Sequence, residues 1–429
     1  MTSGNFGDDA QVGIDIADNI IHFTVQVSSR KVLYKHNIDV KYDFGLDLNS
    51  NQVDLLRIGM TVFISQLFLC ANVNISEETN CNLISKFGRL TNLLYNIRNY
   101  EEYTNILPPR IWLENHAFPK RGRSKDGNLT KPKCAINLVT GGKDSYVSGL
   151  LLRRNEYKVI NCHIAGLNIA TTDLELAACQ KLYDAVTIVH VQGFDSLVRD
   201  AASISRCLGR PPAFNYVPRG RDILSVFFAL PIAQNNRATY LSLSCERDLW
   251  KNNIVGERGQ IPIHDTQSEL TVAEISGAVR YVMPNVHVFS PIAGLHEIKS
   301  LMWLLRNKPE VIEAMSSCFF GKWCGQCSKC ARYYLIQEFS GIHVINFRSN
   351  PLHPLCPYLK RFLKNPPDPG LPFQSAVSFL LEELHLVEHH VSTELGSVSK
   401  AIDSQYDNPN DLFRVHPASL MPRKFRSSL

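Results

Sequence analysis

The sequence predicts an α/β fold with a doubly wound parallel sheet. Between residues 134 and 345, short runs rich in apolar and β-branched residues alternate with longer stretches of helical periodicity. Strands joined through helices pair in parallel, and right-handed crossovers place the helices on both faces of the sheet. The first predicted strand ends in the pair Gly141-Gly142, directly before a helical pattern, as in a tight βα turn. We therefore expect the chemistry at this edge of the sheet, because ligands bind beyond the carboxyl ends of such strands.

The composition is that of a globular protein. The chain has 429 residues, long for one domain, with 45% hydrophobic and 20% charged residues. A net charge of +5 is compatible with anionic nucleotides but does not favour nucleic acid as a partner. No apolar run is long enough to cross a membrane, and no signal peptide precedes the first strand, so we expect no membrane association. Twelve unevenly spaced cysteines then favour a reducing, cytoplasmic setting.

Residues 1–113 are predicted to form a separate α+β module. Alternating β-branched residues at Ile20–Val27 and Val32–Tyr42 predict an antiparallel hairpin, and apolar spacing predicts helices at 52–71 and 82–98. The module contains no cluster of chemically active side chains. We expect it to pack on or cap the rest of the protein, and a role in substrate recognition stays open.

The core, residues 134–345, is predicted to alternate strands and helices. The candidate strands are 135–139, 157–164, 186–192, 239–244 and 286–290. The candidate helices are 143–154, 172–184, 195–206, 220–235, 267–282 and 295–305. Several polar motifs directly follow one of these strands, so they can converge on one crevice.

Two polar segments flank this core. The basic, glycine-containing segment 114–133 is interpreted as an exposed linker, and a mobile arm that approaches phosphates is the alternative. Residues 346–429 begin rich in proline and continue with an apolar helix at about 374–387, which predicts a peripheral helix and a tail. His385 and His389 belong to a His-x-x-Glu-His pattern, which we interpret as the polar stripe of that helix rather than a protease site.

The run from Thr140 to Ser145, Thr-Gly-Gly-Lys-Asp-Ser, is the strongest chemical motif. Backbone N–H groups of such a turn and of the first helical turn form an anion cradle. Lys143 adds a positive charge, while Asp144 and Ser145 offer oxygens to Mg²⁺ or to a phosphate. The run is not a Walker A loop, because Asn137 stands where the first glycine should be and Asp144 replaces the Ser or Thr.

The second strong motif is a group of four cysteines within thirteen residues, Cys318, Cys324, Cys327 and Cys330. Four thiolates at this spacing match a tetrahedral Zn²⁺ site, and Gly325 permits a tight knuckle between two ligands. An iron–sulfur cluster and redox-active cysteines are the alternatives. Because the protein would fill all four positions, we expect the metal to be structural.

Two further segments contain candidate binding residues. Arg219 and Arg221 precede an apolar helix that Asp222 could cap, and we expect them to face an anion unless they are merely solvated. Glu246 and Arg247 lie just beyond a predicted buried strand, where either could reach a substrate or a metal. Ion pairing within this charged run is the simpler explanation.

The loop resembles the Ser-Gly-Gly-x-Asp-Ser signature of the PP-loop (N-type) ATP pyrophosphatases, with Thr140 in place of the first Ser. With the Val-Pro-Arg segment at 217–219 and the late cysteine knuckle, it is similar to two families of that superfamily. They are the 7-cyano-7-deazaguanine synthases and the ATP-dependent epimerases of UDP-N-acetylmuramoyl-L-alanyl-L-glutamate. The epimerase resemblance extends further, through Ser244–Arg247, Ser290–Glu297 and Trp323–Cys330, and covers about 134–340.

The resemblance implies an adenine nucleotide α-hydrolase-like fold and cleavage of ATP between its α- and β-phosphates, with Mg²⁺, to adenylylate a small carboxylate. ATP contacts are then expected at Thr140, Gly141, Gly142, Lys143, Asp144, Ser145, Arg219 and Arg221. Substrate contacts are expected at Cys245, Glu246 and Arg247, and catalytic roles at Lys143, Asp144, Ser145 and Glu246. In an epimerase Glu246 is the candidate base, and Cys245 is a weaker one because its thiol would need a lowered pKa.

Departures from these families leave the substrate open. Cys245 stands where the epimerases have Asn, and Asp248-Leu249 replaces a small Ser-Ala pair. An amidating or nitrile-forming enzyme, in which ammonia attacks the adenylate, is the alternative. A different class is an enzyme that modifies a protein or nucleic acid in defence, docked through residues 1–113. A tRNA-modifying enzyme is disfavoured by the charge pattern, and a homodimer is compatible with the sequence.

Overall fold

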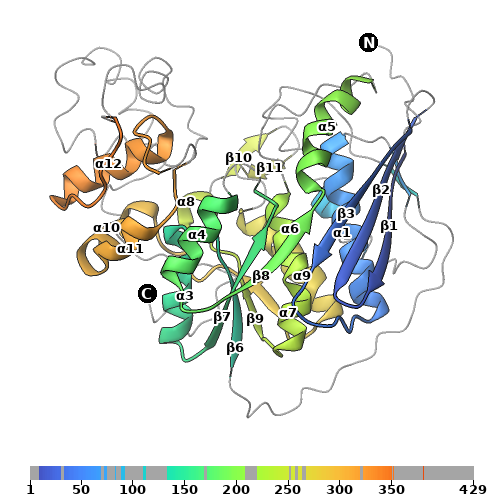
Figure 1. Ribbon diagram of the computed structural model, residues 1–429, viewed down its shortest axis with the longest axis horizontal. Helices are drawn as coiled ribbons and strands as arrows, with labels where there is room; N and C mark the ends of the chain where they lie inside the picture. Colours follow the sequence, from blue (N-terminus) through green and yellow to red (C-terminus); the bar gives the residue numbers. More distant parts are fainter. Residues whose placement is uncertain are drawn as a thin grey trace.

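The computed structural model describes residues 9–29, 33–68, 72–74, 83, 88–91, 110–112, 133–168, 172–207, 220–250, 253–256, 259–262, 267–318, 322–349, 351 and 380. The main sheet consists of β1 (Asp9–Ala17), β2 (Ile20–Ser28), β3 (Leu33–Lys41), β4 (Asn72–Asn74), β5 (Arg110–Trp112), β6 (Cys134–Leu138), β7 (Lys158–Ala165), β8 (Val186–Gln192), β9 (Tyr240–Ser242) and β12 (His287–Phe289). Their order is β12-β9-β6-β7-β8-β3-β2-β1-β4-β5 (Figure 1). A separate antiparallel pair consists of β10 (Asn253–Gly256) and β11 (Gly259–Pro262).

Helices cover this sheet and build a lobe beside it. They are α1 (Ser50–Phe68), α3 (Lys143–Arg154), α4 (Thr172–Leu182), α5 (Phe194–Cys207), α6 (Arg221–Phe228), α7 (Leu230–Asn235), α8 (Arg247–Trp250), α9 (Glu269–Val282), α10 (Glu297–Asn307), α11 (Pro309–Ala314) and α12 (Ser328–Ser340). The α/β class predicted from the sequence is confirmed. Among the described residues, no helix combines the length and the apolar character needed to cross a membrane.

The five strands β12, β9, β6, β7 and β8 pair in parallel. Their order reverses next to β6: the chain adds β7 and β8 on one side of β6, then β9 and β12 on the other. Because right-handed crossovers that run in opposite directions place their helices on opposite faces, this sheet is doubly wound. The point of reversal lies between β6 and β9, and the loop at 140–145 directly follows β6.

The N-terminal strands extend the same sheet. The predicted hairpin is confirmed as β2 and β3, and β3 pairs antiparallel with β8 through Asp39–Lys41 and His190–Gln192. The fully buried Tyr42 hydroxyl donates a hydrogen bond to the carbonyl of Phe228 at the end of α6. One hydrophobic core runs from β1–β3 and α1 into β6–β9. The described part of residues 1–113 therefore shares its sheet and its core with the later strands.

Other predicted boundaries are only partly covered by the described residues. The predicted helix at 52–71 is confirmed as α1. The described residues omit most of the predicted helix at 82–98 and nearly all of the segment 114–133. They also omit the predicted helix at about 374–387, except for residue 380, and the histidines of the His-x-x-Glu-His pattern. The domain boundaries predicted from the sequence stay predictions.

The core elements match their predicted positions, with one break. Each predicted core strand and helix is present within a few residues of its expected bounds. The helix expected at 220–235 consists of α6 and α7, which meet at Ala229. Pro231 lies in the first turn of α7, where a residue without an N–H group is tolerated, whereas it would interrupt one continuous helix.

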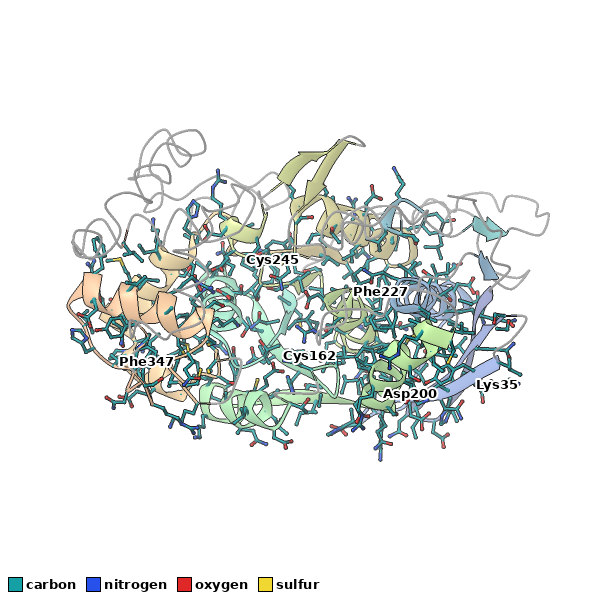
Figure 2. The ribbon with its side chains drawn as sticks, turned by 90° about the horizontal axis from the view of Figure 1, so that it is seen from above. Lys35, Cys162, Asp200, Phe227, Cys245 and Phe347 are labelled. Atoms are coloured by element: carbon teal, nitrogen blue, oxygen red, sulfur yellow. The ribbon has the colours of Figure 1, made fainter. Side chains whose placement is uncertain are left out.

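A C-terminal lobe made of α10, α11 and α12 packs against α3. It has a hydrophobic cluster of its own, which includes Leu301, Leu335 and Ile336 and takes Val147 from α3. This lobe is the orange region of Figure 1. Figure 2 places its residue Phe347 and the β3 residue Lys35 at opposite ends of the molecule. The lobe thus contacts α3, the helix that directly follows the loop at 140–145.

Candidate active site and metal centre

The loop after β6 turns tightly before α3 begins at Lys143. Gly141 has a φ of +70°, and a Cβ on this residue would lie 2.5 Å from the Cβ of Ala178 in α4. Gly142 is the N-cap of α3, and no side chain caps the helix there. The amides of the first helical turn are therefore not occupied by a capping side chain, as an anion cradle requires. Thr140 is exposed and Asp144 is half-buried, so the loop has an accessible side.

The two glycines of this loop should tolerate a methyl group very differently. We expect Gly141→Ala to lower the free energy of unfolding by roughly 1–3 kcal/mol, because it combines a left-handed φ with a steric clash. The matched variant is Gly142→Ala, whose added Cβ would lie 3.8 Å from its nearest neighbour, Ser317 Oγ. Urea denaturation measures both. Equal stability of the two variants would contradict the described turn.

Buried polar side chains hold the loop and α3 on the sheet. Asn137 Nδ2 in β6 donates to the carbonyl of Ser145 at 3.0 Å and lies 3.2 Å from Asn161 Oδ1 in β7. His163 Nδ1 lies 2.9 Å from the carbonyl of Val139, and burial lowers the pKa of His163, so the ring donates this bond as a neutral imidazole. Sequence reasoning missed these roles, because an isolated Asn or His in a strand gives no signal.

Ser145 is buried in the loop rather than presented at its surface. Its hydroxyl donates to the carbonyl of Gly142 at 3.1 Å and lies 3.1 Å from the hydroxyl of Tyr183. The side chain therefore fixes the first turn of α3. Contact with a phosphate would require this hydroxyl to exchange one of these partners.

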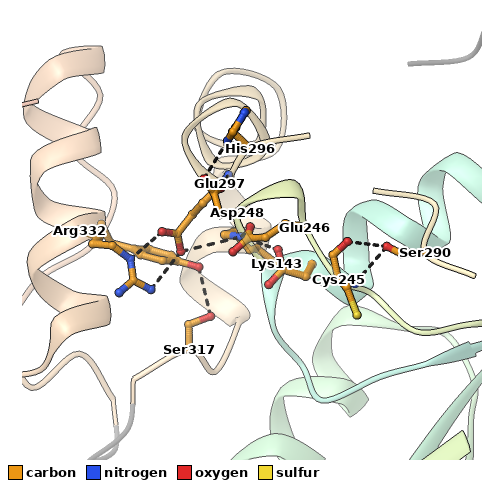
Figure 3. Close-up of polar contacts among 11 residues, drawn as sticks. Lys143, Cys245, Glu246, Asp248, Ser290, His296, Glu297, Ser317 and Arg332 are labelled. Carbon is orange, nitrogen blue, oxygen red and sulfur yellow. Dashed lines mark hydrogen bonds and ion pairs between the residues drawn. The ribbon is translucent and has the colours of Figure 1, made fainter. Parts of the chain in front are cut away.

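Lys143 is the centre of a buried ionic cluster (Figure 3). Its side chain is 2% exposed; Nζ bonds Asp144, lies 2.7 Å from Glu246 Oε2 and lies 3.9 Å from Glu297 Oε1. Burial opposes the charged form, but the adjacent carboxylates prevail and raise the pKa of Lys143 well above its usual range. The ammonium group therefore stays charged, and it holds together residues that follow β6, β9 and β12.

The cluster continues through α10 and α12. The carboxylate of Glu297 accepts from Arg332 Nε at 2.6 Å and from Arg332 Nη2 at 3.3 Å, a bidentate pair. Asp248 Oδ1 lies 2.7 Å from His296 Nδ1, and Asp248 Oδ2 accepts from the backbone N–H of Glu297 at 2.8 Å. The predicted convergence of motifs that follow different strands is confirmed for Lys143, Glu246 and Glu297.

Glu246 and Cys245 lie next to each other but differ as acid–base groups. Burial and the carboxylate of Asp144 raise the pKa of Glu246 well above its usual range, so its carboxylate holds a proton more readily than an ordinary glutamate. Burial, followed by the carboxylates of Asp222, Asp144 and Glu246, raises the pKa of the Cys245 thiol well above its usual range. The thiol of Cys245 therefore lacks the lowered pKa that a basic thiolate needs, and the ranking of these two residues as bases stays a prediction.

The remaining candidate residues have different positions. Arg247 begins α8; its backbone N–H donates to the carbonyl of Leu295 at 2.9 Å and its side chain is half-buried. Arg221 begins α6 and is half-buried, and the described contacts do not join its side chain to the ionic cluster. Arg219 lies outside the described residues. The ionic partners of Glu246 and Asp248 are Lys143 and His296, which lie outside the charged run at 246–248.

The expected helix cap at Asp222 is wrong. Gly220 is the N-cap of α6 and no side chain caps the helix, while Asp222 Oδ2 accepts from Gln267 Nε2 at 3.1 Å. Gly220 has a φ of +82°, a left-handed conformation that lets the chain enter α6 without a polar cap. The carboxylate of Asp222 is instead close enough to Cys245 to raise the pKa of its thiol.

The four predicted cysteine ligands lie together and could hold a metal ion, since their sulfur atoms are all within 4.8 Å of one another. The Sγ atoms of Cys318 and Cys327 are 3.8 Å apart, and those of Cys324 and Cys330 are 3.9 Å apart. Four sulfurs about 2.3 Å from a tetrahedral Zn²⁺ are about 3.8 Å apart, so this spacing fits zinc.

The backbone around the cysteines fits a charged, metal-binding cluster. N–H groups point at three sulfurs, from Cys324 to Cys318, from Gln326 to Cys324 and from Cys330 to Cys327. Gly325 has a φ of +75°, and a Cβ there would lie 1.9 Å from the carbonyl oxygen of Ser349, so only glycine fits this turn.

Comparison with known proteins adds one match. A model of a family of unknown function (DUF6395) matches residues 280–420, about a third of the chain. The matched segment contains Glu297, Arg332 and the four cysteines, but neither the loop at 140–145 nor Glu246. No curated protein matches the chain.

Proposed function

We propose that the protein is an ATP-dependent adenylating enzyme that activates a carboxylate and releases pyrophosphate. One observation carries the proposal: at the point where the sheet order reverses, the uncapped N-terminus of α3 meets carboxylates that follow β9 and β12. Nucleotide phosphates bind at this point of doubly wound sheets, on helix N-terminal amides. The sequence resemblance to PP-loop ATP pyrophosphatases supports the same assignment.

The charges around the loop support a requirement for Mg²⁺. Lys143 is already balanced by Glu246 and by Asp144, so the buried cluster offers little surplus positive charge to a nucleotide. The carboxylate of Asp144 is 36% exposed and is the accessible oxygen donor of the loop. Mg²⁺ typically joins one or two carboxylates to substrate phosphates, and we assign Asp144 to this role.

In the proposed reaction, a carboxylate oxygen attacks the α-phosphorus of ATP and pyrophosphate leaves from the opposite side. The backbone amides at 140–145 and Lys143 stabilise the charge that develops on the phosphates. The adenylate makes the neighbouring Cα–H more acidic, and Glu246, with its raised pKa, removes that proton. A proton then returns to the opposite face of Cα, and attack of water on the acyl carbon releases AMP and the epimerised acid. The reaction is then most like that of the muropeptide L-glutamate epimerases, with Arg247 and the backbone of Cys245 beside the substrate.

We also assign a structural Zn²⁺ to the four cysteines. The sulfur spacing and the three N–H···S contacts support this choice. The metal would stabilise the start of α12, because Cys327 is both a ligand and the N-cap of that helix. It leaves no open position for chemistry.

The products of ATP cleavage test the proposal. The protein is incubated with ATP, Mg²⁺ and a panel of small carboxylates, and the nucleotides are separated by chromatography. We expect AMP and pyrophosphate, at a rate that Asp144→Asn lowers at least roughly 100-fold. Asp39→Asn, on an exposed pair with His22 in the N-terminal sheet, is the matched control and should keep the rate. ADP and phosphate as products would contradict the proposal. In a parallel reaction with added ammonium, a new amide or nitrile would identify the amidating alternative.

A further inference from the structure

We propose that metal binding at the four cysteines and phosphate binding at the loop 140–145 are linked, so that each ligand strengthens the binding of the other. The inference rests on the proposed function for the identity of both ligands. It is carried by two separate connections between the cysteine cluster and the loop.

The first connection is a backbone hydrogen bond. The N–H of Ser316 donates to the carbonyl of Gly141 at 2.9 Å. A Cβ on Gly142 would lie 3.8 Å from Ser317 Oγ and 3.9 Å from the carbonyl oxygen of Ser316, so this segment covers the turn. The next residue along the chain is Cys318, a proposed metal ligand. Only Ser317 therefore separates Ser316, which bonds the loop, from a proposed metal ligand.

The second connection runs through α12. The helix begins inside the cluster, with Cys327 as its N-cap and Cys330 in its first turn. One turn later, Tyr333 donates a hydrogen bond to Ser317 Oγ at 3.4 Å, and Arg332 binds both oxygens of Glu297. Glu297 lies 3.9 Å from the ammonium group of Lys143. A metal at the cysteines would thus hold the start of α12. That helix in turn holds Glu297, an ionic partner of Lys143.

Loss of the metal should loosen both connections together. Four thiols without a metal no longer hold the knuckle, and metal binding at such sites is coupled to local folding. The segment 316–318 and the start of α12 would then gain freedom, and the loop would lose its contacts at Gly141 and Lys143. Because equilibrium coupling is reciprocal, a nucleotide that stabilises the ordered loop must raise the affinity for the metal by the same factor.

The experiment measures release of zinc rather than activity. Full-length protein is loaded with zinc, its content is checked by elemental analysis, and a chromogenic chelator reports release with and without Mg²⁺ and α,β-methylene-ATP. This analogue resists cleavage between the α- and β-phosphates, so no turnover occurs. We expect release to slow at least about fivefold at saturating nucleotide, the lower end of ordinary coupling between sites. Mg²⁺ alone should leave the rate unchanged.

Equilibrium dialysis of the same nucleotide distinguishes failure of the linkage from failure of the proposed function. Saturable binding with an unchanged zinc release rate overturns the linkage and leaves the proposed function standing. Absence of nucleotide binding contradicts the proposed function and the linkage with it. Absence of bound zinc contradicts the metal assignment and also removes the linkage.

A pair of variants tests the route through α12. Tyr333→Phe removes only the hydroxyl that bonds Ser317, and we expect this variant to keep its zinc. The factor by which nucleotide slows zinc release should fall roughly twofold or more, which is within the range of ordinary coupling. Tyr34→Phe is the matched control, since the hydroxyl of this β3 residue bonds Asp200 in α5. It should leave the slowing unchanged. Equal slowing in both variants would contradict this route.

Discussion

Replacing Lys143 with methionine should abolish ATP turnover and lower the free energy of unfolding by roughly 3–5 kcal/mol. The change leaves the buried carboxylates of Glu246 and Glu297 without their shared ammonium group. Part of this cost disappears when Glu246 is protonated. The pKa of an unfolded glutamate is about 4.3. A carboxyl group whose pKa is higher than this in the folded protein destabilises the fold as the pH rises above the unfolded value. The deficit measured by urea denaturation should therefore grow with pH.

A second variant separates the ion pair from simple loss of packing. In Lys143→Met/Glu246→Gln, the uncompensated charge is gone, so we expect part of the lost stability to return while turnover stays absent. Lys308→Met is the surface control, because Lys308 pairs with Glu310 at an exposed site. Its free energy of unfolding should stay within about 0.5 kcal/mol of that of the parent protein. If the double variant is no more stable than Lys143→Met, the uncompensated charge of Glu246 is not a cause of the lost stability.

Cys327→Ser should remove the bound metal and destabilise the C-terminal lobe strongly. Cys327 supplies a proposed ligand and also caps α12, where its Sγ accepts from the N–H of Cys330. The hydrophobic cluster of the lobe surrounds these cysteines, so α12 loses its anchored end. We expect a loss of unfolding free energy on the order of 4 kcal/mol or more, the range reached when a structural metal is lost.

Elemental analysis and thermal unfolding measure this change. Cys207→Ser is the matched control, because Cys207 is exposed at the end of α5. It should retain the metal and lie within about 0.5 kcal/mol of the parent protein. Full metal content in Cys327→Ser, or loss of metal in Cys207→Ser, would contradict the assignment.

The parallel core was predictable because each of its strands is an apolar run between turn residues. β8 and α3 have the bounds expected from the sequence. β1 was not predicted although its apolar residues at 10, 12, 14 and 16 alternate with polar residues and glycine, because Gly13 and Asp15 have low strand propensity. Its nine-residue pairing with β2 overrides that local preference. The continuity of the N-terminal strands with β8 was not predictable either, because sequence patterns do not report which strands pair.

The candidate site was predictable where a residue directly follows a strand. This rule identified Lys143 and Glu246, which lie 2.7 Å apart although 103 residues separate them. Glu297 belongs to a segment noted for its family resemblance, but no role followed from its local sequence. The helix with Arg332 was missed because its start overlaps the cysteine motif. Its bidentate contact with Glu297 depends on how the lobe folds back on the sheet.

The central claim is that a carboxylate attacks the α-phosphorus of ATP at this loop. The most direct test uses ATP, Mg²⁺ and a panel of carboxylates labelled with ¹⁸O, from amino acids to N-acyl glutamates, and mass spectrometry of the nucleotide formed. Attack by the carboxylate followed by acyl transfer leaves one ¹⁸O atom in the phosphate of AMP. We predict labelled AMP from at least one member of the panel. Unlabelled AMP throughout, or ADP as the product, would contradict carboxylate activation.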